Sequence, residues 1–347
     1  MALGTWALAF EASLKVKPAA RVTKKGVVMK KFVLPAAIAL ALLSAPALAA
    51  DLGRKMVTKA PPVAAVNPWD IAFGAALMTD YNFRGISQSD RGPSVNAYFE
   101  ARYNSAANLQ WYAGIAGSSV KLATDPSAEI DFYGGVRPTF GPLALDFGFI
   151  YYYYPKEVQF GAPGGPPAFF PSGNTTLANT DYWEVYAKGV YTFNDMVAAG
   201  FNVYYSPDWL NTGADGTYVS GTLKFTGPSS SFPPNWGGYL SGEVGYYALG
   251  TTKFDPVAFP APGGWDLPSY TYWNVGGGLT YKVFTLDLRY HDTDLSKEEC
   301  NVLTADPGAT LGGTPIPITN TAGALSKWCG SAFIAKLSVD TTLSAIK

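Results

Sequence analysis

From Trp69 onward the chain consists of short stretches in which apolar residues alternate with small or polar ones. In the first stretch the apolar residues stand at every second position, at Trp69, Ile71, Phe73, Ala75 and Leu77. We call the two alternating sets of positions in a strand its two parities. Side chains of a β-strand point alternately to its two faces, so this repeat of two predicts strands with one apolar face. Clusters of Gly, Pro, Asn, Asp and Ser separate the stretches, which is typical of antiparallel strands joined by turns.

Such stretches are predicted to form about twelve strands, each near or above the roughly 9–11 residues that a tilted strand needs to cross a bilayer. They are expected near residues 69–83, 93–103, 109–120, 128–140, 143–154, 181–193, 197–206, 215–226, 238–249, 269–282, 284–293 and 331–341. Long and short connections alternate, which is the layout of an up-and-down barrel with tight turns at one edge. The longest connections, expected to be external loops, fall at 155–180, 250–268 and 294–330.

Charged residues within the strands indicate which solvent each face meets. In a membrane barrel, a Lys or Arg facing lipid near mid-bilayer costs roughly 2–4 kcal/mol, so charges should oppose the large apolar side chains. The strand charges that do so are interpreted, with Arg84, as lining the lumen: Asp70, Glu100, Arg102, Asp131, Arg137, Asp146, Glu184, Lys188, Lys224, Glu243, Asp287, Arg289, Lys336 and Asp340. Asp181, Asp215 and Asp292 break the rule, but they lie at the long-loop ends of their strands, where the cost is small.

Aromatic residues of the apolar parity gather at both ends of the strands, which predicts two girdles at the membrane interfaces. Those near the short turns are Tyr103, Trp111, Phe140, Phe193 and Tyr281, and those near the long loops are Tyr81, Phe83, Tyr151, Tyr153 and Tyr205. A soluble sheet with one buried face would alternate in the same way. The two girdles, and the lack of a second sheet to cap the apolar face, favour an all-β transmembrane barrel.

The residues before Trp69 follow a different pattern. After two lysines, the apolar run Phe32–Leu43 and the small-x-small site ending at Ala49 predict a secretory signal peptide. A membrane anchor is the alternative, but the run is short and ends in Pro46 and alanines. The chain is therefore divided into residues 1–28, an extension upstream of a natural start at Met29; 29–49, the signal peptide; 50–68, a flexible periplasmic leader; and 69–347, the barrel.

The composition agrees with an exported protein. Charged residues make up 15% of the chain and aromatic residues another 15%, which is unusual for a cytosolic enzyme. The chain after the signal segment has more acidic than basic residues, and it lacks the basic patch that a nucleic-acid partner would require. Its two cysteines, Cys300 and Cys329, are expected to pair in an oxidising compartment. The expected partners are the lipid bilayer with lipopolysaccharide, the outer-membrane assembly machinery and small hydrophilic solutes, and no cofactor or metal is expected.

The segment TDYNFRGISQSDRGPSVNAYF, Thr79–Phe99, resembles the opening motif of the TorF family of outer-membrane porins. The tyrosine run Tyr151–Tyr154 and the segments Asp181–Tyr191 and Leu288–Asp294 resemble later blocks of the same pattern. The likeness covers most of residues 69–341. It implies an outer-membrane barrel of a Gram-negative bacterium with a diffusion function.

Two chemical alternatives involve the single histidine and the acids that follow it. His291 beside Asp292 could act as a general base in an outer-membrane lipid hydrolase, but the chain has no G-x-S-x-G motif. Asp292 and Asp294, with Glu298 and Glu299, could bind Ca²⁺ through hard oxygens. Their spacing does not match an EF-hand loop, and a solvated acidic loop is the simpler interpretation.

The sequence thus predicts a porin that lets small hydrophilic solutes or ions diffuse through its lumen. The inward acids slightly outnumber the inward bases, which predicts a weak preference for cations. A lumen of twelve strands is narrow, and opposite charges could pair across it. The loops at 155–180 and 294–330 could also fold inward, so the alternative is a closed or plugged barrel with a structural or adhesive role.

Overall fold

The computed structural model describes residues 68–161, 175–255, 259–317 and 319–346, so the predicted upstream extension, the signal peptide and all of the leader except Pro68 lie outside the described residues. Twelve long strands form one antiparallel sheet: β1 (Trp69–Met78), β4 (Ser94–Ala106), β5 (Leu109–Ser118), β6 (Glu129–Phe140), β7 (Leu143–Tyr153), β8 (Tyr182–Asn194), β9 (Val197–Ser206), β10 (Gly216–Thr226), β11 (Trp236–Leu249), β12 (Tyr270–Tyr281), β13 (Phe284–Thr293) and β16 (Ala332–Thr342). The predicted all-β up-and-down barrel is confirmed.

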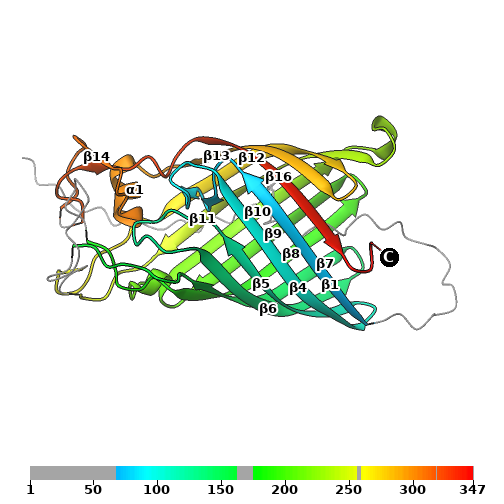
Figure 1. Ribbon diagram of the computed structural model, residues 1–347, viewed down its shortest axis with the longest axis horizontal. Coiled ribbons are helices and arrows are strands. Elements are labelled where there is room, and N and C mark those ends of the chain that lie inside the picture. Colours follow the sequence, from blue (N-terminus) through cyan, green and yellow to red (C-terminus); the bar gives the residue numbers. More distant parts are fainter. Residues whose placement is uncertain (1–67, 162–174, 256–258, 318, 347) are drawn as a thin grey trace, which may run out of the picture. The chain divides into compact units, whose positions relative to one another are not determined.

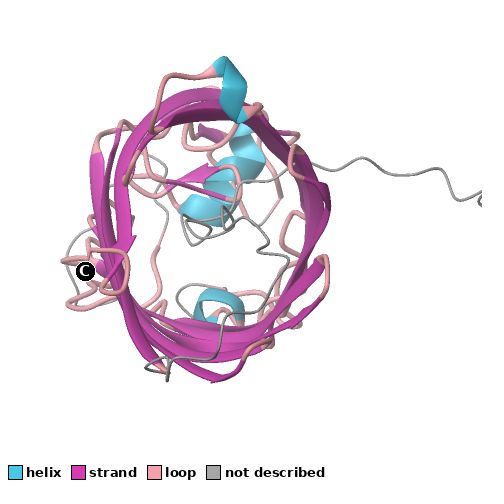
Figure 2. Ribbon diagram, turned by 90° about the vertical axis from the view of Figure 1, so that its right-hand side faces the viewer, coloured by secondary structure: helices cyan, strands magenta, loops and turns pink. Residues whose placement is uncertain are grey.

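Each long strand lies beside its neighbours in the sequence, and β16 pairs with β1. β9 lies along β10, where the Thr226 amide donates to the Met196 carbonyl at 2.7 Å. The sheet therefore closes into a barrel (Figures 1 and 2). Short turns join the strands at one edge, which we call the short-turn edge. The opposite, long-loop edge carries α1 (Lys297–Thr304) and the small strand β14 (Thr310–Leu311).

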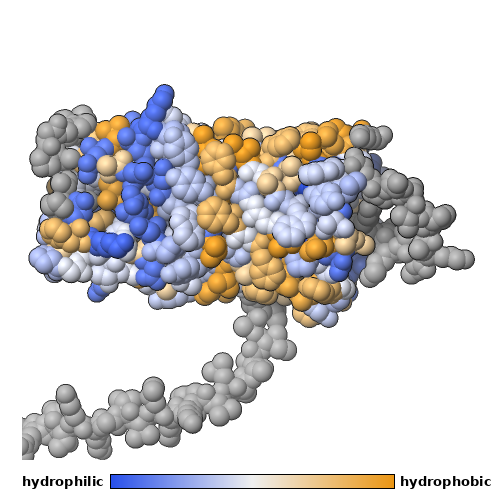
Figure 3. Space-filling view, turned by 90° about the horizontal axis from the view of Figure 1, so that it is seen from below, coloured by the Kyte–Doolittle hydropathy of each residue, from blue (hydrophilic) through white to orange (hydrophobic). Residues whose placement is uncertain are grey.

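Apolar side chains form rows across the outer face of the barrel. Phe99 stands opposite Ile115, and Ile115 stands opposite Phe132 on the next strand. Phe132 is 47% exposed, and the other two side chains are also exposed. Figure 3 shows apolar surface spread over the wall, with hydrophilic side chains gathered toward the long-loop edge. An apolar surface of this extent marks a site of contact with a membrane or another protein.

On the inner face, tyrosines lie over glycines of the neighbouring strand. Tyr186 stands opposite Gly148, and a Cβ atom added to Gly148 would lie 2.5 Å from the Tyr186 ring. The same arrangement joins Tyr133 to Gly114 and Tyr239 to Gly278. The glycines thus leave room for large rings within a narrow lumen.

The long connection after β13 contains a helix that the sequence pattern did not predict. Ser296 and Glu299 form a reciprocal capping box at the start of α1, and Ala305 ends the helix in a left-handed conformation. Such a box satisfies backbone donors that the first helical turn leaves free. The connection also contains β15 (Ala324–Leu325), paired with β14. Among the described residues, no helix has the length and hydropathy that a membrane crossing requires.

The first strand is shorter than predicted. β1 ends at Met78, and residues 79–92, which we call the plug segment, turn back into the barrel as a hairpin of β2 (Asn82–Phe83) and β3 (Ile86–Ser87). Gly85 has a φ of +90°, and a Cβ atom there would lie 2.2 Å from Thr293. This turn therefore requires glycine.

The predicted girdle positions of Tyr81 and Phe83 are wrong for the same reason. The Tyr81 hydroxyl donates to Glu129 at 2.5 Å, and the Phe83 ring packs edge-on against Tyr152 at 5.9 Å. Both partners belong to the inner face of the wall. Parity predicts the orientation of a side chain only while the strand continues, and here the strand ends before Tyr81.

Candidate functional site

The plug segment crosses the lumen near the long-loop edge. Its residues reach several strands of the wall: Tyr81 contacts Glu129 on β6, and Phe83 contacts Tyr152 on β7. On the opposite side, the Tyr270 hydroxyl of β12 donates to the Arg84 carbonyl at 3.0 Å. Burial, and next the charge of Glu129, raise the pKa of Tyr81 well above its usual value, so its hydroxyl remains a donor.

The tip of the plug segment carries a buried ion pair. Arg84 donates from Nη1 and Nη2 to the two carboxylate oxygens of Glu184 on β8, at 2.7 and 2.8 Å. Glu184 is 0% exposed and also accepts a hydrogen bond from the Tyr152 hydroxyl. Burial by itself lowers the pKa of Arg84, but the nearby Glu184 carboxylate raises it overall, so the guanidinium stays charged. Two parallel hydrogen bonds to one carboxylate fix the orientation of the guanidinium as well as its position.

Three tyrosine rings of the wall surround the same guanidinium. The Arg84 Cζ atom lies 4.6 Å from the ring centroid of Tyr204, 4.5 Å from that of Tyr218 and 4.8 Å from that of Tyr247. These distances are typical of cation–π contacts. We call the three tyrosines together with Glu184 the tyrosine cage. None of the three was singled out from the sequence, although each has the inward parity of its strand.

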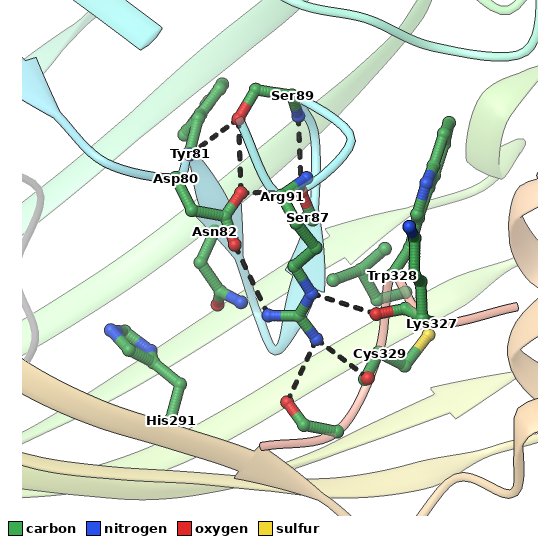
Figure 4. A network of polar contacts seen from close by, with 12 residues as sticks. Asp80, Tyr81, Asn82, Ser87, Ser89, Arg91, His291, Lys327, Trp328 and Cys329 are labelled. Carbon is green, nitrogen blue, oxygen red and sulfur yellow. Dashed lines mark hydrogen bonds and ion pairs between the residues drawn. The ribbon is translucent and has the colours of Figure 1, made fainter. Parts of the chain in front are cut away.

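A second arginine of the plug segment binds it to the last long loop, residues 294–330 (Figure 4). Arg91 donates to the carbonyls of Lys327, Cys329 and Gly330, and its Nη1 lies 3.3 Å from Asp80. Asp80 in turn accepts hydrogen bonds from Ser87 and Ser89 of the plug segment. The network thus joins the start of the chain's first long loop to the end of its last.

The predicted disulfide is confirmed and lies next to this network. Cys300 of α1 and Cys329 are bonded, across a sequence separation of 29 residues. The disulfide bond anchors residues 327–330, whose backbone carbonyls accept hydrogen bonds from Arg91. The same end of the plug segment is also held by Asp90, which pairs with Lys121 at 2.5 Å and accepts a hydrogen bond from the Trp328 indole. Although burial raises the pKa of Asp90, these two partners lower it overall.

Toward the short-turn edge the inner face carries a network of charges from four strands. Glu100 pairs with Arg102 at 2.6 Å and with Arg137 at 2.8 Å. Asp146 pairs with Arg137 at 3.3 Å and with Lys188 at 3.6 Å. The side chains of these bases and of Asp146 keep 12–19% of their surface exposed, in contrast to the buried ion pair at the plug.

A second network lies on the opposite wall. Arg289 donates to both oxygens of Asp287, at 3.0 and 2.8 Å, and to the Asn274 side chain at 2.7 Å. Asn274 also donates to Glu243, which accepts from Tyr218 of the tyrosine cage at 2.8 Å. The Asn274 amide and the Glu243 carboxylate therefore link Arg289 of this wall to the cage.

The remaining residues predicted to line the lumen lie outside these networks. Asp131, near the plug, is buried, and Lys224 lies over the Tyr239 ring at 4.5 Å. Asp340 accepts from the Tyr98 hydroxyl at 3.2 Å, and Lys336 is partly buried on the same strand. Asp70, at the short-turn edge, accepts a hydrogen bond from the Ser344 hydroxyl.

The predicted girdle residues other than Tyr81 and Phe83 all lie on outward-facing strand positions. Tyr151 is partly exposed, with its hydroxyl donating to Asp181. The others are exposed: Tyr103, Trp111, Phe140, Tyr153, Phe193, Tyr205 and Tyr281. Aromatic side chains at these ends of the strands suit the headgroup regions of a bilayer.

His291 lies on the inner face, away from the acid that follows it. Its Nδ1 atom lies 2.8 Å from the Tyr272 hydroxyl, and the two rings are stacked. Asp292 instead accepts from the Tyr290 hydroxyl, since successive side chains of a strand point to opposite faces. The pairing of His291 with Asp292 considered for a hydrolase is therefore not formed. Among the described residues, no group of three or more His, Cys, Asp or Glu side chains is placed to hold a metal ion.

Each of the three long loops lies partly outside the described residues, at 162–174, 256–258 and 318. In the loop at 155–180, Glu157 accepts hydrogen bonds from Thr124 and the Thr180 amide. In the loop at 250–268, the Thr252 amide donates to the Trp265 carbonyl. The sequence suggested the loops at 155–180 and 294–330 as plugs. Within the part of the chain that the structure describes, the segment 79–92 crosses the lumen.

Comparison with known proteins places the chain in a family without assigning a function. The model of the bacterial family of unknown function Gcw_chp matches residues 63–309, so the chain belongs to that family. No curated protein matches. Similar solved structures include an outer membrane channel from Pseudomonas putida F1, with 10% identity, a TM-score of 0.40 and coverage of 82% of this chain and 100% of that one.

Two further structures show similar levels of likeness. The NanC porin has 9% identity and a TM-score of 0.38, covering 78% of this chain and 98% of that one. The outer membrane protein OmpT of Vibrio cholerae has 12% identity and a TM-score of 0.33, covering 83% of this chain and 100% of that one. Likeness at this level carries no argument about the chain.

Proposed function

We propose that this member of the Gcw_chp family is an outer-membrane channel for small hydrophilic solutes, closed in its resting form by the plug segment. The observation that carries the proposal is the opposite chemistry of the two faces of the wall. Phe132 and its outward neighbours expose apolar surface, whereas charges such as Arg137 and Asp146 face the lumen. This is the arrangement that a solute pathway through a bilayer requires.

The plug segment is held by contacts that can open without breaking the wall. Its backbone is not part of the twelve-stranded sheet. It is attached by one buried ion pair, by the hydrogen bonds of Tyr81, Asp90 and Arg91, by aromatic packing and by single backbone hydrogen bonds. A segment held in this way can leave while the barrel stays folded. The channel then has two states, which differ in the position of residues 79–92.

The remaining parts of the proposal follow from this assignment. A signal peptide at 29–49 exports the chain, the assembly machinery inserts it, and lipopolysaccharide surrounds the long-loop edge. The inward charges give a weak preference for cations, because acids such as Glu129 and Glu184 line the lumen beside the plug. The TorF resemblance supports the same diffusion function.

Single-channel recording in planar bilayers tests the proposal. The mature chain is compared with a variant in which residues 82–88 are replaced by a Gly-Ser linker of equal length. We expect rare or small conductance steps from the first protein and larger, longer steps from the second. If both refold as heat-modifiable barrels and neither conducts, the channel assignment is wrong and the barrel is a closed structural one.

A further inference from the structure

The tyrosine cage has the composition of a binding site for an organic cation. Its three rings present their faces to one planar guanidinium, and the carboxylate of Glu184 meets that group with both oxygens. Aromatic faces with a carboxylate recognise guanidinium and ammonium groups in ligands by the same contacts. In this structure the occupant is Arg84 of the same chain.

The cage is built by the wall and does not depend on its occupant. Tyr204, Tyr218 and Tyr247 lie on β9, β10 and β11, and their rings pack against one another at centroid distances of 6.4 and 5.7 Å. The Tyr218 hydroxyl is fixed by Glu243, and the Tyr247 ring also packs edge-on against Trp209 at 6.0 Å. Rings held in this way keep their positions when Arg84 leaves.

The occupant, in contrast, belongs to a hairpin that is joined to the strands of the wall through side chains. The backbone hydrogen bonds that Ser87 and Gln88 make outside the segment go to the long loops. Arg84 has a φ of +48° and lies at the turn between β2 and β3, beside Gly85. The Tyr270 hydroxyl holds its carbonyl, but no ladder of backbone hydrogen bonds joins β2 or β3 to a strand of the wall. A free cation of the same shape can therefore compete with Arg84 for the cage.

We propose that the tyrosine cage is a binding site for small organic cations with a guanidinium group, which enter from the long-loop edge and displace Arg84. A guanidinium suits the site better than an ammonium, because only the planar fork reaches both oxygens of Glu184 while it stacks on the rings. That such cations are also solutes of the channel rests on the proposed function. The binding site itself does not.

Calorimetric titration of the refolded mature chain with agmatine tests the site. Arg84→Ala, whose cage is vacated, should bind one agmatine saturably, at least about tenfold more tightly than n-butylamine, which carries a single ammonium. The double variant Arg84→Ala/Glu184→Gln and the unaltered protein, whose cage is filled, should each bind agmatine at least about tenfold more weakly. Equal affinities in the three proteins, or no saturable binding to Arg84→Ala, would overturn the proposal.

Two further readouts keep the outcome decisive. If Arg84→Ala does not refold, refolding is repeated with agmatine: recovery of the heat-modifiable barrel with agmatine but not with n-butylamine supports the site, and no recovery overturns it. Conductance separates the site from the proposed function. If the barrel binds agmatine but never conducts, the proposed channel function is wrong and the binding site stands. If it conducts but does not bind agmatine, only the binding site is wrong.

Discussion

The guanidinium of Arg84 meets the carboxylate of Glu184 through two parallel hydrogen bonds of 2.7 and 2.8 Å, between residues 100 positions apart in the chain. One partner belongs to the plug segment and the other to the wall. The pair is the main charged contact that holds the plug across the lumen, so its removal should affect stability and permeability together.

Glu184→Gln should loosen the plug. The substitution keeps the shape of the side chain but leaves a buried guanidinium without its counter-charge, and removing one partner of a buried pair costs about 3–5 kcal/mol. We expect lower stability in urea unfolding and more frequent conductance steps. Asp125→Asn, which neutralises an exposed carboxylate in a loop, is the control. Unchanged stability and conductance in Glu184→Gln would show that the ion pair does not hold the plug.

Arg91→Ala should release the plug segment from the last long loop. Arg91 donates to three carbonyls at 327, 329 and 330, and hydrogen bonds from a charged donor contribute about 1.5–3 kcal/mol each. Hydrogen exchange should accelerate in residues 79–92 and 327–330 together. Lys121→Ala removes an exposed ion pair with Asp90 and should change stability by less than about 1 kcal/mol. Faster exchange in only one of the two segments would contradict the tie between them.

Reduction of the disulfide should destabilise the last long loop. Closing a loop of this length contributes about 3–4 kcal/mol in the chain-entropy model, and Cys329 lies within the stretch that accepts from Arg91. We expect a lower Tm in the presence of a reductant, and the same lower Tm in Cys300→Ser/Cys329→Ser with or without it. A Tm that the reductant does not change would mean that the loop is held by its other contacts.

Gly148→Ala should be destabilising although the change is small. The added methyl group would lie 2.5 Å from the Tyr186 ring and 2.8 Å from the Gly134 carbonyl, and such overpacking costs about 1–3 kcal/mol. Gly117→Ala is the matched control, because its Cβ atom would meet its nearest neighbour at 3.8 Å. Urea unfolding of the two variants in the same detergent compares them. Equal stabilities would show that the Tyr186 ring can move aside at no cost.

A lysine on the outer face should report its depth in the bilayer. Phe132 lies within its strand and Phe140 at the short-turn end of the same strand, and both side chains are exposed. Phe132→Lys should cost about 2–4 kcal/mol in lipid vesicles and Phe140→Lys about 0–1 kcal/mol. Unfolding in vesicles measures both values. In a barrel surrounded by water the two substitutions would be equally tolerated.

The strand pattern and the main charge layout were predictable because both are local. A strand repeats every two residues, so the sequence alone separates Glu100 and Arg137 from Phe99 and Val136 on the opposite face. The pairing of Cys300 with Cys329 also follows from sequence and compartment. The helix α1 was missed because its eight residues are too few for the helical repeat to appear, although Ser296 and Glu299 carry the capping signal.

What occupies the lumen was decided by the tertiary structure. The motif around Arg84 is specific in sequence, but its partner Glu184 and the rings of Tyr204, Tyr218 and Tyr247 lie on strands that closure of the barrel brings opposite it. Parity gives the face of each side chain and not its distance from the other wall. The sequence by itself therefore determined a charged lumen inside an apolar wall, and only the closed barrel decided that residues 79–92 cross that lumen, because contacts across it depend on the register of all twelve strands.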